Sequence, residues 1–132
     1  MTVEELAEAA VSLKLTGSFD PGEVTAALGL APSDQWRAGQ RGAAPKLRRS
    51  SDGWVLRLGT AVGQVGEQID RAVGQLAQTS EQLGHVLSTQ GISGCLTVAV
   101  DAGEDGWPVV ALSAATLAFL ASSGLSLDID IL

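Results

Sequence analysis

The cationic side chains of this chain are concentrated in one stretch, residues 37–57. Six of its eight Lys and Arg residues lie there: Arg37, Arg41, Lys46, Arg48, Arg49 and Arg57. Two of the three tryptophans, Trp36 and Trp54, lie beside or within it. A guanidinium group donates paired hydrogen bonds to a carboxylate or phosphate, and an indole stacks on a guanidinium or a ligand ring.

These residue types predict a surface that binds a partner or an anionic ligand. The residues assigned to it are Trp36, Arg37, Arg41, Arg48, Arg49, Trp54 and Arg57. The alternative is a solvated loop whose arginines pair with the acidic remainder of the chain, with both tryptophans in the core.

Other residues that could carry chemistry form weaker patterns. Asp128 and Asp130 alternate on a predicted strand, about 7 Å apart, and such a pair could bind a cation or transfer protons. Polar residues on the wet face of a strand explain them equally. The single histidine, His85, and the single cysteine, Cys95, exclude a Cys/His zinc site and an internal disulfide. We therefore predict no catalytic residue, no metal site and no cofactor.

Composition and charge limit the class of protein. The 132 residues are 45% hydrophobic and 17% charged, which is typical of one folded domain. A net charge of −7 argues against nucleic-acid binding, which depends on cations that contact phosphates. The acidic first ten residues are unlike a secretory signal. The uncharged stretch 108–127 contains too many Ser, Thr and Gly residues for a membrane span, so we expect a cytoplasmic protein.

Hydrophobic periodicity predicts the elements. Residues 1–10 are expected to be a helical or frayed lead-in, followed by a single domain over 11–132. Alternation predicts strands over 11–16, 54–58, 96–100, 107–112 and 125–131. Helical spacing predicts helices over 21–28, 61–90 (with a break near Thr79–Ser80) and 114–123. Asp20 and Ser113 precede two of these helices as N-caps, and Gly29 and Gly124 follow the same two.

The order of these elements indicates an α+β fold. Nearly every predicted strand alternates, which implies one buried sheet face and one wet face. We predict a mainly antiparallel sheet with helices packed on one face, in a ferredoxin-like-related βαββαββαβ order.

Several of these stretches together resemble a known family. They are Asp20-Pro21 leading to Leu28-Gly29-Leu30-Ala31-Pro32, then Trp36, Gly39 and Gly53-Trp54, and finally Leu112-Ser113 through Gly124-Leu125-Ser126-Leu127-Asp128-Ile129-Asp130-Ile131. This pattern is similar to domain-of-unknown-function family 4279, a family of uncharacterised bacterial proteins. The resemblance implies a fold but no activity, cofactor or site residue.

Three functions are compatible with the sequence. The first is a non-enzymatic protein-binding module, of an interaction or immunity type, that uses the basic Arg/Trp surface. The second is a small anionic-ligand or phosphate-ester binding protein, with or without enzymatic activity, in which Arg37 and Arg41 converge with Asp128 and Asp130. The third is self-association through a sheet edge or through residues 108–127.

Overall fold

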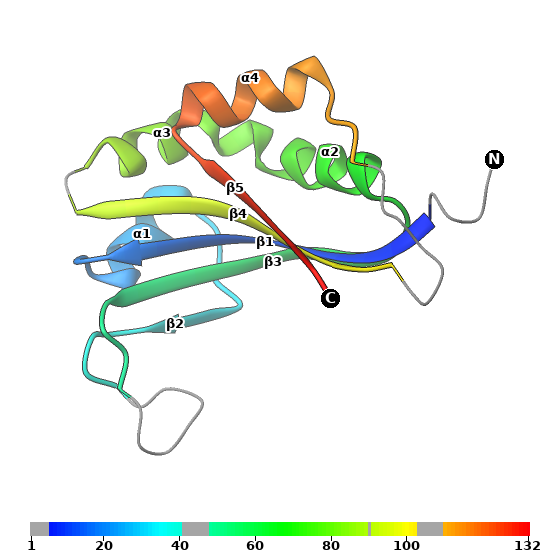
Figure 1. Ribbon diagram of the computed structural model, residues 1–132. Helices are drawn as coiled ribbons and strands as arrows, with labels where there is room; N and C mark the ends of the chain where they lie inside the picture. Colours follow the sequence, from blue (N-terminus) through cyan, green and yellow to red (C-terminus); the bar gives the residue numbers. More distant parts are fainter. Residues whose placement is uncertain (1–5, 41–47, 90, 103–109) are drawn as a thin grey trace.

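One long strand, β1 (Leu6–Gly17), organises a five-stranded sheet. It pairs antiparallel with β3 (Asp52–Gln64) on one side and with β4 (Ile92–Asp101) on the other. The short β2 (Asp34–Trp36) pairs antiparallel with β3, and β5 (Ser126–Ile131) pairs parallel with β4. The strand order is β2-β3-β1-β4-β5 (Figure 1). The computed structural model describes residues 6–40, 48–89, 91–102 and 110–132.

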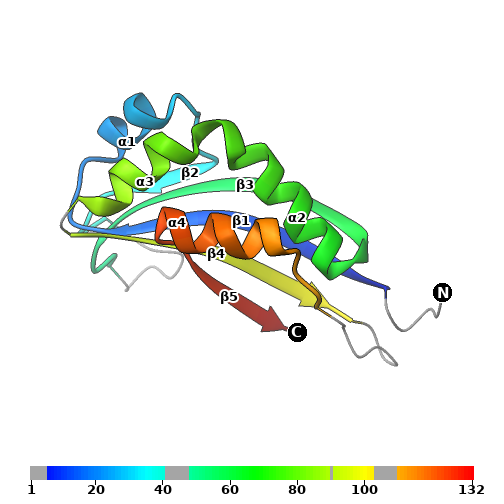
Figure 2. The ribbon, with the colours of Figure 1, turned by 90° about the horizontal axis from the view of Figure 1, so that it is seen from above.

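The helices lie together on one face of this sheet (Figures 1 and 2). They are α1 (Pro21–Leu28), α2 (Val65–Leu76), the 3-10 turn η2 (Ala77–Thr79), α3 (Ser80–Ser88) and α4 (Ala114–Ser123). The opposite face of the sheet, called the outer face below, carries no helix in the described part of the chain. The predicted α+β class, with a mainly antiparallel sheet, is confirmed.

Strand alternation places the core between the sheet and the helices. In β1 the odd-numbered residues from Ala7 to Leu15 are buried, while the even-numbered Glu8 and Lys14 are exposed on the outer face. Helix α2 packs Ile69 and Leu76, both fully buried, against this apolar stripe. Burial of each such side chain stabilises the fold by about 1.5–3 kcal/mol, so this layer holds a glycine-rich helix that propensity alone would not.

The predicted caps of two helices are confirmed. The Asp20 carboxylate accepts a hydrogen bond from the Gly22 N–H at 2.9 Å, and Gly29 ends α1 in the left-handed region with φ 68°. The Ser113 hydroxyl accepts from the Thr116 N–H at 3.1 Å at the start of α4. These local side-chain bonds satisfy amides that the helix itself leaves unpaired.

Two predicted boundaries are wrong. Strand β1 begins at Leu6, so residues 6–10 pair in the sheet and are not a lead-in, while residues 1–5 lie outside the described residues. The helix predicted from residue 61 begins at Val65, because β3 continues to Gln64 opposite β1. Val62 is therefore 70% exposed on the outer face instead of packing on the helix stripe. The predicted break near Thr79–Ser80 is confirmed by η2.

The predicted ferredoxin-like order is not confirmed. Of the strand predicted over 107–112, residues 107–109 lie outside the described residues, and 110–112 form neither strand nor helix. The long helix is two helices, so the observed order is βαββααβαβ. Helix α4 connects β4 to β5, and this crossover makes their pairing parallel. No helix in the described ranges is long and apolar enough to cross a bilayer.

Two glycines of α2 give a matched test of this packing. A Cβ at Gly66 would lie 1.9 Å from the Ala111 carbonyl oxygen, whereas a Cβ at Gly74 would meet nothing within 4 Å. We expect Gly66→Ala to lower the free energy of unfolding by about 1–3 kcal/mol, because backbone must move. Gly74→Ala should raise it by up to about 1 kcal/mol through helix propensity. Urea unfolding measures both, and equal effects of the two substitutions would contradict the close approach.

Candidate functional site

Trp36 lies on the outer face of the sheet, where its partner in β3 is a glycine. The register pairs Trp36 with Gly53, and a Cβ at Gly53 would lie 2.1 Å from two atoms of the indole. Only glycine leaves room for the ring at this point. Trp54, which follows Gly53 in β3, faces the core, since successive side chains of a strand alternate between its faces.

Two cations lie over the Trp36 ring. The guanidinium carbon of Arg49 is 4.0 Å from the ring centroid, and the Nζ of Lys14 is 6.0 Å from it. Arg49 is held by backbone hydrogen bonds, since its N–H donates to the Gln40 carbonyl at 2.7 Å and its carbonyl accepts from Gly39 at 2.8 Å. Its Nε is buried and has no hydrogen-bond partner. Cation–π attraction explains this stacked arrangement.

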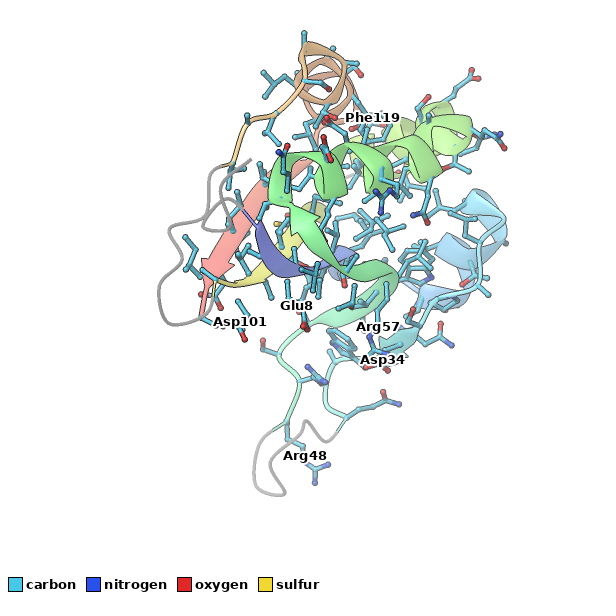
Figure 3. All side chains as sticks on the ribbon, turned by 90° about the vertical axis from the view of Figure 1, so that its right-hand side faces the viewer. Glu8, Asp34, Arg48, Arg57, Asp101 and Phe119 are labelled. Atoms are coloured by element: carbon cyan, nitrogen blue, oxygen red, sulfur yellow. The ribbon has the colours of Figure 1, made fainter. Side chains whose placement is uncertain are left out.

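Two further arginines extend the basic surface. Arg57 lies opposite Ser12 on the outer face of β3, and Figure 3 shows it beside Asp34. Arg48 lies far out on the connection between β2 and β3 (Figure 3), where its Nη1 donates to the Gly39 carbonyl at 3.5 Å. We refer to Lys14, Trp36, Arg48, Arg49 and Arg57 as the Trp36 surface.

Arg37 pairs with acidic residues of the chain, as the alternative interpretation of the basic stretch predicted. Its side chain makes ion pairs with Asp20 at 3.5 Å and with the buried Asp52 at 3.2 Å. The Asp52 carboxylate also accepts hydrogen bonds from the N–H groups of Ala38 and Phe19, both at 2.8 Å. Asp52 thus joins the end of β1, the turn after β2 and the start of β3, and any acidic partner of Arg37 would compete with two carboxylates.

These contacts change the ionisation of Asp52. The Ala38 and Phe19 amides lower its pKa most, and the Arg37 guanidinium lowers it further, against a smaller opposing effect of burial. The ionised form is therefore favoured by the fold.

Trp54, one of the predicted site residues, lies in the core. Trp54 is 0% exposed, and its indole N–H donates to the Thr25 hydroxyl at 3.0 Å beneath α1. Its assignment to the contact surface is wrong, because strand alternation turns it into the core. Arg41 lies outside the described residues, as does Lys46.

The predicted convergence of Arg37 with Asp128 and Asp130 does not occur. Arg37 follows β2 at one edge of the sheet, and the two aspartates lie on β5 at the other edge. Acidic residues instead share the outer face around β4. In the strand register Glu8 lies opposite Asp101 (Figure 3), and Asp128 lies opposite Thr97. The strand order therefore separates Arg37 from the two aspartates that the anionic-ligand hypothesis placed beside it.

The described residues contain no cluster for a metal ion and do not bring Cys95 and His85 together. No group of three His, Cys, Asp or Glu side chains there could hold a metal ion. His85 lies on α3 in the helical layer, while Cys95 pairs with Lys14 and faces the outer side of the sheet. The sheet therefore separates the only imidazole from the only thiol.

The structure adds three residues that the sequence analysis did not assign to the site: Lys14, Gly53 and Asp52. Lys14 could have been found as the lone cation among the outward positions of a predicted strand. Gly53 and Asp52 act through the pairing of β2 with β3 and through backbone amides distant in sequence, for which the sequence holds no local signal.

The comparisons with known proteins give a family and nothing beyond it. The family model described as "Domain of unknown function (DUF4279)" matches residues 6–132, so the chain belongs to this family and the predicted resemblance is confirmed. No curated protein and no solved structure matches the chain.

Asp52 predicts a specific loss of stability in acid. A carboxyl whose pKa is lowered by folding stabilises the protein above its ordinary pKa of 3.8, and this contribution is lost as the pH falls below that value. Asp52→Asn should lower the urea midpoint at neutral pH and flatten its fall in acid. The matched control is Asp34→Asn, which changes an exposed aspartate of β2 in the same way. Parallel pH profiles of wild type and Asp52→Asn would contradict the assignment.

Gly53→Ala should displace the Trp36 ring. Because the added Cβ meets a side chain that can swing away, we expect a cost of about 1–3 kcal/mol together with loss of the Arg49 stack. The Trp36 indole N–H resonance in a ¹⁵N–¹H spectrum should shift, while that of the buried Trp54 stays near its position. An unchanged Trp36 resonance would show that the ring does not lie over Gly53.

Proposed function

We propose that this member of the DUF4279 family is a non-enzymatic protein-binding module whose contact is the Trp36 surface. The observation that carries the proposal is the indole of Trp36 with Arg49 stacked on it, on a sheet face that none of the described helices covers. Tryptophan and arginine are the residues that dominate binding energy at protein interfaces once they are desolvated.

The charge of the surface indicates an acidic partner. Lys14, Arg48, Arg49 and Arg57 are four of the eight cations in a chain of net charge −7. Among their side chains, only that of Arg48 donates a hydrogen bond within the described residues, and none is in an ion pair there. The Nε of Arg49 is buried, but the exposed side chains of Lys14, Arg48 and Arg57 can contact carboxylates of a partner, and complementary charge favours association with such a surface.

The rest of the chain supports a protein partner over nucleic acid. The strong negative charge opposes a phosphate backbone. The outer face also carries Glu8, Asp101, Asp128 and Asp130 across β1, β4 and β5. A cytoplasmic location belongs to the same proposal, since a lone thiol stays reduced there.

A small anionic ligand is the second candidate. A shallow hollow of about 380 Å³ lies beside Trp36 and Arg37 at the start of α1. Its arginine is already paired with Asp20, which also lines the hollow and would repel an anion. This carboxylate is the reason that the protein-binding proposal is preferred.

Two substitutions test the Trp36 surface. We expect Trp36→Ala and Arg49→Glu each to weaken partner binding by about 2 kcal/mol, which is roughly thirtyfold in Kd. Arg71→Glu makes the same charge change on α2 and should leave this binding intact. The measurement is crosslinking capture of partners from lysate, followed by titration of the captured protein. A partner bound equally by wild type and both variants would contradict the proposal, and a thermal shift with phosphate esters but no partner would favour the second candidate.

A further inference from the structure

A second part of the molecule, separate from the Trp36 surface, combines a free strand edge with a small pocket. Strand β2 pairs with β3 only at Gly53–Val55, so β3 lacks a neighbouring strand on that side from Leu58 to Gln64 within the described ranges. One of its carbonyls, that of Leu58, instead accepts a hydrogen bond from the Gln75 side-chain amide of α2 at 2.9 Å. At this edge the Leu58 carbonyl is thus paired with a side chain and not with the N–H of a neighbouring strand.

Apart from the register shift at Leu58, the free edge of β3 lacks the usual protection against strand pairing. Native sheets protect their edges with charged residues, prolines or very short strands. The β2 edge has three residues, and the β5 edge carries Asp128 and Asp130. The sequence from Leu58 to Gln64 contains no charge and no proline, and Val62 within it is 70% exposed. An extended segment would therefore meet no charged side chain of this strand itself.

A pocket lies between this edge and α2. The register of β1 and β3 shifts so that Val11 pairs with Gly59 and Ser12 with Arg57, which leaves Leu58 without a partner in β1. At this shift the pocket of about 120 Å³ opens, with the apolar side chains of Val11 and Ala72 among its lining residues. Its volume suits one side chain of a bound segment, as in recognition by strand addition.

Helix α2 places hydrogen-bond donors and one cation at this pocket. Gln68, Arg71 and Gln75 line the pocket from α2. Gln68 is buried, and its amide donates to the Ala7 carbonyl at 3.3 Å. Arg71 is exposed and has no ion pair among the described residues. It is the only cation of the helices in a chain of net charge −7.

We propose that the edge of β3 from Leu58 to Gln64 binds an extended acidic peptide segment of a partner protein, which adds a strand beside β3 and places a carboxylate on Arg71. The backbone supplies the affinity through edge groups that no strand pairs within the described residues, and Arg71 selects the charge. This site lies between the sheet and α2, whereas the Trp36 surface lies on the outer face, so the two proposals are independent.

The probe is a phage library of random linear decapeptides selected on the full chain. We expect the enriched peptides to contain Asp or Glu, and their synthetic copies to bind with a Kd that rises at least about tenfold in Arg71→Gln. Gln82→Glu, at an exposed position of α3 away from this edge, makes the same charge change of one unit and should leave that Kd unchanged. Arg71 is exposed on a helix surface, so its replacement keeps the fold, and an unchanged melting temperature checks this.

Amide hydrogen exchange then distinguishes strand addition from attachment by charge alone. Added backbone hydrogen bonds should slow exchange at amides between Gly59 and Gly63 in the peptide complex. No enrichment on wild type, binding insensitive to Arg71→Gln, or unchanged exchange over this edge would each overturn the proposal. Peptides lost in Arg49→Glu but kept in Arg71→Gln would overturn it too, while supporting the Trp36 surface.

Discussion

The alternation of one strand at Gly53 and Trp54 is the constraint on which both the core and the candidate site depend. It turns Trp54 inward, where the indole is fully buried and bonded to Thr25 of α1. The same alternation turns Gly53 outward, and the absence of its side chain leaves the space that the Trp36 ring fills. One indole therefore fixes α1 on the sheet, and the other lies on the surface with Arg49 stacked on it.

Asp52, directly before this pair, ties the surrounding loops to the sheet. A buried carboxylate is unfavourable unless it is hydrogen-bonded and paired, and Asp52 receives two backbone amides and Arg37. The chain thereby uses one arginine of its basic stretch for stability and leaves others on the outer face. A cluster of cations in sequence is thus divided in space between a structural and a surface role.

The local patterns of the sequence predicted those elements that local contacts define. Helix α1 begins after Asp20 and ends before Gly29 as predicted, because its caps are bonds between near neighbours. The helix predicted from residue 61 failed at its start, since the spacing of Val62 and Val65 suits a helix while pairing with β1 keeps Val62 in a strand. The pairing of β3 with β1, more than fifty residues apart in sequence, therefore outweighed the helical spacing of these apolar residues.

The sequence by itself determined the family, the α+β class, the negative charge and the presence of a basic stretch with two tryptophans. These follow from composition and short-range periodicity, which need no knowledge of distant contacts. Only the tertiary structure decided that Trp54 is core and Trp36 is surface, that Arg37 is paired with Asp52, and that the aspartates of β5 lie across the sheet from the arginines. The physical reason is that strand order and register set which side chains meet, and these depend on hydrogen bonds between segments far apart in the chain.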